Sequence, residues 1–202
     1  MVNLKQSLKY LETMKKIFLF TLFFQFTTYS QNYKSEQIRT FDYNKLVDST
    51  VYSLDKNELE TLLKNNKTEY TIVISWGYWC KPCNVFLPKL LKFKSEIEPL
   101  LNVWIISVEP DNSKKLFTHK FSLEEKFSYT KPSFVISEIY GKSRFKKYDA
   151  FLIDLIGKDK FKNEHRGMSQ VIMYKNSDIV FLSDWNMTDE VILENINRLV
   201  KS

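Results

Sequence analysis

The 202-residue chain contains few cysteines, histidines and glycines, and each scarcity excludes a class of structure. Its two cysteines exclude the scaffold of several disulfides that many small secreted proteins use. His119 and His165 would have to complete the four ligands of a structural zinc site, but the chain has neither a second cysteine pair nor the paired-histidine spacing of such sites, so we predict no metal. We expect each histidine to lie at the surface. The four glycines leave tight turns to Asn, Asp and Ser.

Excess charge is scarce outside the amino terminus. Four lysines and one glutamate in residues 1–30 account for +3 of the formal net charge of +6, and the small remainder argues against a nucleic-acid partner. One basic run has aromatic residues between its charges: Lys142, Arg144, Phe145, Lys146, Lys147 and Tyr148. We expect a solvated face there, and a phosphate-binding patch is the alternative.

The amino terminus has the pattern of an export signal. The apolar run at residues 17–26 has about ten residues, whereas a helix needs about 20 to cross the hydrocarbon core of a membrane. Two lysines precede this run and small residues follow it, so we predict a signal peptide that begins at Met14 and is cleaved after Ser30. Residues 1–30 thus comprise an N-terminal extension and this signal peptide. We expect an exported, periplasmic protein; an uncleaved signal anchor that tethers it to the membrane is the alternative.

Hydrophobic periodicity predicts strands that alternate with helices. The first strands are predicted at residues 51–54, 71–75 and 103–108, and the first helices at residues 55–64 and 81–98. Further elements are predicted as a helix at 113–126, a strand at 134–137, a helix at 145–156, a hairpin of strands at 170–174 and 179–182, and a helix at 188–200. Because strand–helix–strand units pair in parallel through right-handed crossovers, this order predicts an α/β domain.

The two cysteines lie in the run Trp79-Cys80-Lys81-Pro82-Cys83, where a predicted strand leads into a predicted helix. Two thiols about one helical turn apart suit a disulfide. Unpaired amides and the positive end of the helix dipole favour a thiolate at Cys80, and Lys81 adds a cation. Pro82 is tolerated because first-turn amides lack helical partners. We predict that Cys80 attacks a disulfide and Cys83 resolves the mixed disulfide; an inert staple is the alternative, although so small a loop stabilises little.

A longer run around the cysteines resembles a known family. Residues 73–83 have the sequence Val-Ile-Ser-Trp-Gly-Tyr-Trp-Cys-Lys-Pro-Cys, and Pro88 follows five residues later. This run resembles the thioredoxin superfamily, and within it the exported thiol-disulfide reductases of the TlpA and ResA kind. The resemblance implies a thioredoxin-like three-layer α/β fold, with a central mixed sheet and helices on both faces; as a departure from the family, we expect a helical insertion before the last hairpin. It also implies a redox-active cysteine pair with Trp76 and Trp79 packed around it, and no organic cofactor.

One departure from the family concerns the acidic residue that it often buries beneath the second cysteine. The two family positions for this residue hold Ile74 and Phe86 here. Glu109, which follows the next predicted strand, is a candidate substitute close to the cysteines. The alternative, and the commoner situation for a glutamate, is a solvent-exposed carboxylate.

A second departure concerns the family's cis-proline loop, which faces the disulfide and has two candidates here. We prefer Met168-Ser169, because the hairpin and helix that close the fold follow it directly; Lys131-Pro132 is the runner-up. The preferred candidate places Ser169 where the family has proline. We expect a trans peptide there, because a cis bond before a residue other than proline costs ~3–4 kcal/mol.

Together these features predict a domain at residues 51–202, with a linker at 31–50 and an enlarged insertion at about 111–166 that offers a partner-recognition surface. We expect an exported thiol-disulfide oxidoreductase of cell redox homeostasis whose substrates are protein disulfides or dithiols. The resemblance favours the reductase direction, fed by a membrane electron carrier, whereas Lys81 favours oxidation. The alternative function is a non-enzymatic thioredoxin-like module that binds a partner or senses redox state, since the usual proline and buried acid are missing.

Overall fold

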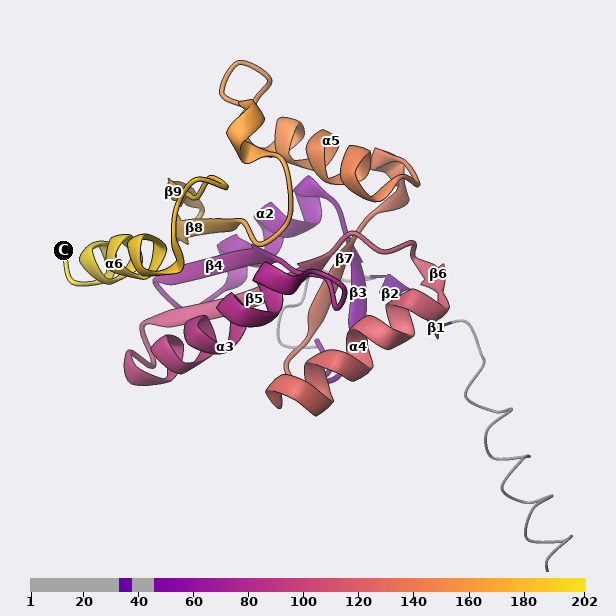
Figure 1. Ribbon diagram of the computed structural model, residues 1–202, viewed down its shortest axis with the longest axis horizontal. Helices are drawn as coiled ribbons and strands as arrows, with labels where there is room; N and C mark the ends of the chain where they lie inside the picture. Colours follow the sequence, from indigo (N-terminus) through magenta and orange to yellow (C-terminus); the bar gives the residue numbers. More distant parts are fainter. Residues whose placement is uncertain (1–32, 38–45) are drawn as a thin grey trace, which may run out of the picture. The chain divides into compact units, whose positions relative to one another are not determined.

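A seven-stranded sheet forms the centre of the computed structural model, which describes residues 33–37 and 46–202 (Figure 1). Its strands lie in the order β2 (Glu36–Gln37), β3 (Val51–Leu54), β7 (Ser133–Ile136), β5 (Leu101–Ser107), β4 (Tyr70–Ser75), β8 (Val171–Lys175) and β9 (Asp178–Leu182). In this order, each strand from β2 to β4 is parallel to the next. Strand β8 is antiparallel to β4, and β9 is antiparallel to β8. The sheet is therefore mixed, as the sequence predicts.

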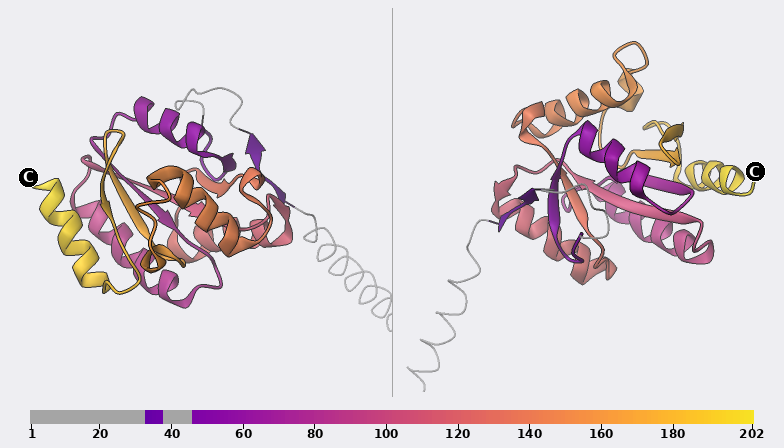
Figure 2. Two further views of the ribbon diagram at one scale, coloured as in Figure 1. Left: turned by 90° about the horizontal axis from the view of Figure 1, so that it is seen from above. Right: turned by 180° about the vertical axis from the view of Figure 1, so that it is seen from behind.

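Helices cover both faces of this sheet (Figures 1 and 2). One face packs against α3 (Lys81–Glu96), α4 (Lys114–Phe127) and α6 (Asp189–Val200), and the other against α2 (Lys56–Asn65) and α5 (Arg144–Ile156). Side chains alternate along the central strands, so that Ile72 and Ile74 of β4 enter the first core and Val73 enters the second. The predicted thioredoxin-like three-layer fold is confirmed.

The segment at residues 111–166 is built into the sheet. Its strand β7 lies between β3 and β5, and the helices on either side of it in sequence, α4 and α5, pack on opposite faces. Leu123 of α4 joins one core and Phe151 of α5 joins the other. The two helices and the strand begin and end within one residue of their predicted bounds. This insertion therefore contributes to the same cores as the rest of the domain.

Local sequence explains where several helices begin. Asp55 caps α2, because its carboxylate accepts a hydrogen bond from the Glu58 amide at 2.9 Å while the Glu58 carboxylate accepts one from the Asp55 amide at 2.7 Å. Ser113 caps α4 and Thr188 caps α6, each by accepting from the amide three residues further on. Each cap satisfies an amide that the first helical turn leaves without a partner.

Residues 33–37, which precede β3, form two short strands. Strand β1 (Tyr33–Lys34) pairs with β6 (Asn112–Ser113), and β2 pairs with β3 at the edge of the main sheet. Between them the buried Ser35 donates its amide to the Asp111 carbonyl at 3.3 Å. The compact unit thus begins at Tyr33, within the segment expected to be a linker. The predicted signal peptide lies outside the described residues, and within them no helix has both the length and the apolar character to cross a membrane.

Truncation of a core residue in α5 tests whether the insertion folds with the rest of the domain. Phe151 is fully buried in a core that also contains residues of β5, β7 and α2. We expect Phe151→Ala to lower the free energy of unfolding by about 3–5 kcal/mol and to preserve a single transition in urea, followed by circular dichroism and tryptophan fluorescence. The control Ile139→Ala, at a side chain that is 72% exposed, should change it by less than ~0.5 kcal/mol. Two separate transitions would show that the insertion unfolds independently.

Candidate redox site

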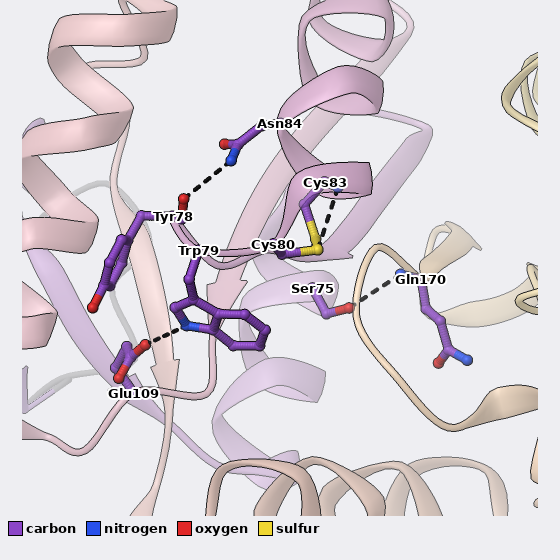
Figure 3. The surroundings of a disulfide bond; sticks show 8 residues. All are labelled: Ser75, Tyr78, Trp79, Cys80, Cys83, Asn84, Glu109 and Gln170. Atoms are coloured by element: carbon purple, nitrogen blue, oxygen red, sulfur yellow. Dashed lines mark hydrogen bonds between the residues drawn. A yellow bond between two sulfur atoms is a disulfide. The ribbon is translucent and has the colours of Figure 1, made fainter.

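A disulfide joins Cys80 to Cys83 at the point where the turn after β4 enters α3 (Figure 3). The Cα atoms of the two cysteines are 5.2 Å apart. Cys80 is the N-cap residue of α3, and its Sγ accepts a hydrogen bond from the Cys83 amide at 3.3 Å. Cys80 retains 7% of its surface in contact with solvent, whereas Cys83 retains none. An incoming reactant therefore reaches Cys80 first.

Backbone and side-chain contacts hold the turn that presents Cys80. The Cys80 amide donates to the Gly77 carbonyl at 2.9 Å, and the Asn84 side-chain amide donates to the Tyr78 carbonyl at 3.0 Å. A Cβ at Gly77 would lie 3.0 Å from Cε2 of Trp79, tighter than nine in ten real Cβ contacts, so any larger residue here would require the Trp79 ring to shift by a few tenths of an ångström. Lys81 and Pro82 follow as the exposed first residues of α3. The turn is thus anchored on both sides of the first cysteine.

The two tryptophans named by the resemblance have different environments. Trp76 is fully buried in the same core as Cys83, with its ring 5.0 Å from His119 and 5.7 Å from Phe127, measured between ring centroids. Trp79 is only partly buried, and its indole Nε1 donates a hydrogen bond to Oε1 of Glu109 at 2.7 Å (Figure 3). Trp76 therefore belongs to the core that contains Cys83, whereas Trp79, directly before Cys80, is bound to Glu109.

Glu109 is a buried carboxylate at the site, and the alternative of a solvent-exposed glutamate is wrong. It follows β5 and has no exposed surface. While Oε1 accepts from Trp79, Oε2 accepts from Nε of Arg144 at 3.0 Å, and Nη2 of Arg144 lies 2.9 Å from the same oxygen. Both carboxylate oxygens are therefore occupied. The two family positions for a buried acid hold Ile74 and Phe86, which lie in the apolar cluster that surrounds Cys83. The buried acid of this site, Glu109, therefore comes from a different position in the sequence.

The expected solvated face of the basic run is wrong for three of its members. Lys147 is fully buried, and its Nζ donates to the carbonyls of Glu109 at 2.8 Å and Ile136 at 2.9 Å. Burial lowers the pKa of Lys147 to about 8. Tyr148 is also buried, and Arg144 is bound to Glu109. Together with Phe151 and Leu152 they lie three or four residues apart, a helical spacing that marks the inner face of α5.

His119 is buried, so the expectation that both histidines lie at the surface is wrong. It shares the inner face of α4 with Leu116 and Leu123, a spacing that was visible in the sequence. Neither ring nitrogen has a hydrogen-bond partner among the described residues. Because burial disfavours the charged imidazolium, the pKa of His119 falls to about 3. His119 is therefore a neutral core residue.

The structure brings Ser169, and not Pro132, to the strand that precedes the cysteines. The Ser169 amide donates to the Ser75 carbonyl at 3.0 Å, and the Gln170 amide donates to the Ser75 hydroxyl at 3.1 Å (Figure 3). Ser169 adopts a left-handed backbone with φ of 73°, and the cis peptide recorded among the described residues is the one before Pro99. Lys131 and Pro132 precede β7, which β5 separates from β4.

The chain is similar to a number of solved structures. No protein-family model and no curated protein matches the chain. Among solved structures, a thioredoxin-like protein in its oxidised form has 17% identity and a TM-score of 0.49, over 86% of this chain and 97% of that one. The exposed lipoprotein thioredoxin Etrx1 of Streptococcus pneumoniae has 16% identity and a TM-score of 0.44, over 67% and 89%. StoA of Bacillus subtilis has 17% identity and a TM-score of 0.39, over 64% and 83%.

These structural neighbours are thioredoxin-like, as the resemblance implied. The assignment itself rests on the chain's own topology. Parallel strands β3, β5 and β4, the antiparallel hairpin β8–β9 and the helices on both faces define a thioredoxin-like α/β fold. The cysteine pair, joined as a disulfide, lies at the start of the helix that follows β4 in this fold.

The buried His119 predicts a specific loss of stability in acid. The unfolded chain binds a proton at this residue near pH 6.5 and the folded chain only near pH 3, so stability falls as the pH drops between these values, by up to ~1.4 kcal/mol per pH unit. We expect His119→Leu to remove this component, so that the variant gains stability relative to the wild type as the pH is lowered in urea titrations. His165→Gln is the control and should keep the wild-type slope. A constant difference between wild type and His119→Leu across this range would contradict the assignment.

Proposed function

We propose that this protein is a thiol-disulfide oxidoreductase in which Cys80 is the attacking thiol and Cys83 the resolving thiol. The observation that supports it most directly is the asymmetry of the pair. Cys80 stands at the helix start with residual exposure, and Cys83 lies beneath it without any. A structural staple needs no such difference between its two sulfurs, whereas sequential attack and resolution do.

The helix start supplies the electrostatic support for a Cys80 thiolate. In the disulfide form its sulfur accepts from the Cys83 amide at the positive end of the α3 dipole, and the same donor is in place to stabilise a Cys80 thiolate. The thiolate attacks one sulfur of a substrate disulfide, which forms a Cys80–substrate disulfide and releases one substrate thiolate. Cys83 then passes its proton to that thiolate and attacks Cys80 Sγ. The second substrate thiolate leaves, and two electrons have moved from the dithiol to the substrate.

The residues around the pair require no organic cofactor for this exchange. Trp76 and Trp79 provide apolar walls behind and beside the sulfurs. Met168 and Ser169 belong to the loop that is hydrogen-bonded to the end of β4, and we propose that this loop faces the substrate backbone. The protein substrates themselves are disulfides or dithiols.

We further propose that the protein works outside the cytoplasm and in the reductase direction. The predicted signal peptide supports export, and a dithiol in an oxidising compartment stays reduced only when a carrier, such as a membrane electron donor, supplies electrons. The apolar cluster around Cys83, which includes Ile74 and Phe86, supports a reducing dithiol because burial disfavours a thiolate. A dithiol whose thiolate gains little stabilisation gives up its electrons more readily.

Capture of mixed disulfides tests the roles of the two cysteines. We expect Cys83→Ser to accumulate covalent adducts through Cys80 that reducing agents release, because the resolving step is blocked. Cys80→Ser, which leaves only the buried thiol, is the matched control and should capture little. Adducts are measured by non-reducing electrophoresis and mass spectrometry of the exported fraction. No adducts with Cys83→Ser, together with no catalysed reduction of insulin by the wild type, would support a non-enzymatic binding or sensing role instead.

The reduction potential of the pair tests the proposed direction. Equilibration with glutathione buffers, followed by alkylation of free thiols, gives the midpoint of the Cys80–Cys83 couple. We expect a value closer to the about −270 mV of thioredoxin than to the about −120 mV of a strong oxidant. A midpoint at the oxidising end would overturn the reductase direction without affecting the roles of the two cysteines.

A further inference from the structure

At the start of α5, the insertion contacts the redox site through two adjacent residues, Arg144 and Phe145. The Arg144 guanidinium makes two contacts with Oε2 of Glu109, at 3.0 and 2.9 Å, and its central carbon lies 5.3 Å from the centroid of the Trp79 ring. The next residue, Phe145, meets the Trp79 ring edge-on at 5.9 Å. The start of α5 therefore contacts the residue that directly precedes Cys80.

The Glu109 carboxylate has a defined set of charged neighbours. Arg144 meets it directly, and Lys147, one turn along α5, binds the Glu109 carbonyl. Asp111 and Glu138 lie close to each other on the adjacent loops, where the Glu138 carboxylate accepts from the Asp111 amide at 3.3 Å. A buried carboxylate requires a partner charge, and Arg144 supplies it at Oε2, the oxygen that Trp79 does not bind.

We propose that Arg144 is a positioning residue of the redox site, which orients Trp79 beside Cys80 and balances the charge of Glu109 through its ion pair. The proposal rests on the function proposed above. One oxygen of Glu109 orients the indole of the residue that precedes Cys80, and the other is paired with Arg144, so the negative charge beside Trp79 is balanced. Charge balance at this carboxylate thereby controls how readily Cys80 forms a thiolate.

The two partners of the ion pair have opposite effects in this arrangement. Loss of the Arg144 cation leaves an unbalanced carboxylate on the Trp79 indole, one residue before Cys80, which disfavours the thiolate. Loss of the Glu109 charge leaves an unpaired cation there, which favours it. Because a buried pair is screened less than a surface pair, both effects persist at moderate salt. Removal of both charges cancels the two effects.

The test is the rate at which Cys80 of the reduced full-length protein reacts with iodoacetamide, at a fixed pH below neutral, with the site identified by mass spectrometry. This rate reports the fraction of thiolate. We expect Arg144→Gln to lower it about tenfold, the ratio that corresponds to one pKa unit. Glu109→Gln should raise it, and the double variant should return it close to the wild-type rate. Arg144→Lys should recover part of the loss, because lysine keeps the charge without the planar fork.

Lys146→Gln is the matched control, since it removes an exposed positive charge from the same turn of α5 and should leave the rate unchanged. Shifts of the same sign in Arg144→Gln and Glu109→Gln would overturn the proposal, as would an equal shift in Lys146→Gln. Should Arg144→Gln fail to fold, a rate in Glu109→Gln no faster than wild type would overturn it as well. Opposite shifts without capture of partners by Cys83→Ser would overturn the enzymatic function alone, and capture without these shifts would overturn the role of Arg144 alone.

Discussion

Burial of strand β4 on both faces is the constraint on which the redox site depends. All six residues of β4 are buried, and the strand is held between β5 on one side and β8 on the other. Its last residue, Ser75, leads into the turn that presents Cys80 and also binds the backbone of Ser169 and Gln170. The disulfide and the loop beside it are therefore positioned by the same strand end, and a change in the packing of β4 would displace both.

The insertion is joined to this site through the loop after β5. Because β7 lies next to β5 in the sheet, α5 is carried over that loop, and Arg144 and Lys147 face it from positions three apart on the helix. Arg144 binds the Glu109 carboxylate and Lys147 binds its carbonyl. Glu109 is thus held by α5 through both its side chain and its main chain. A segment that looked like an appended surface in the sequence supplies part of the structure around the dithiol.

Prediction succeeded where the signal is local and failed where it depends on distant residues. The cysteine pair, the capped helix starts and the alternating strands and helices all follow from residues a few positions apart, and each predicted strand and helix lies within two residues of its observed bounds. The burial of His119 and Lys147 was missed because a lone charged or polar side chain is most often solvated. Their helical spacing with Leu116, Tyr148 and Phe151 contained the information, but the residue types outweighed it.

The sequence by itself determined the dithiol, its place at a helix start and the order of strands and helices, since each depends on neighbouring residues. Only the tertiary structure decided that β7 lies between β3 and β5, and that Glu109 is a buried partner of Trp79 rather than a surface carboxylate. The physical reason is that Arg144 and Glu109 are 35 residues apart in the chain. Their contact exists only after the sheet has placed α5 above the loop that follows β5, and no local pattern encodes that placement.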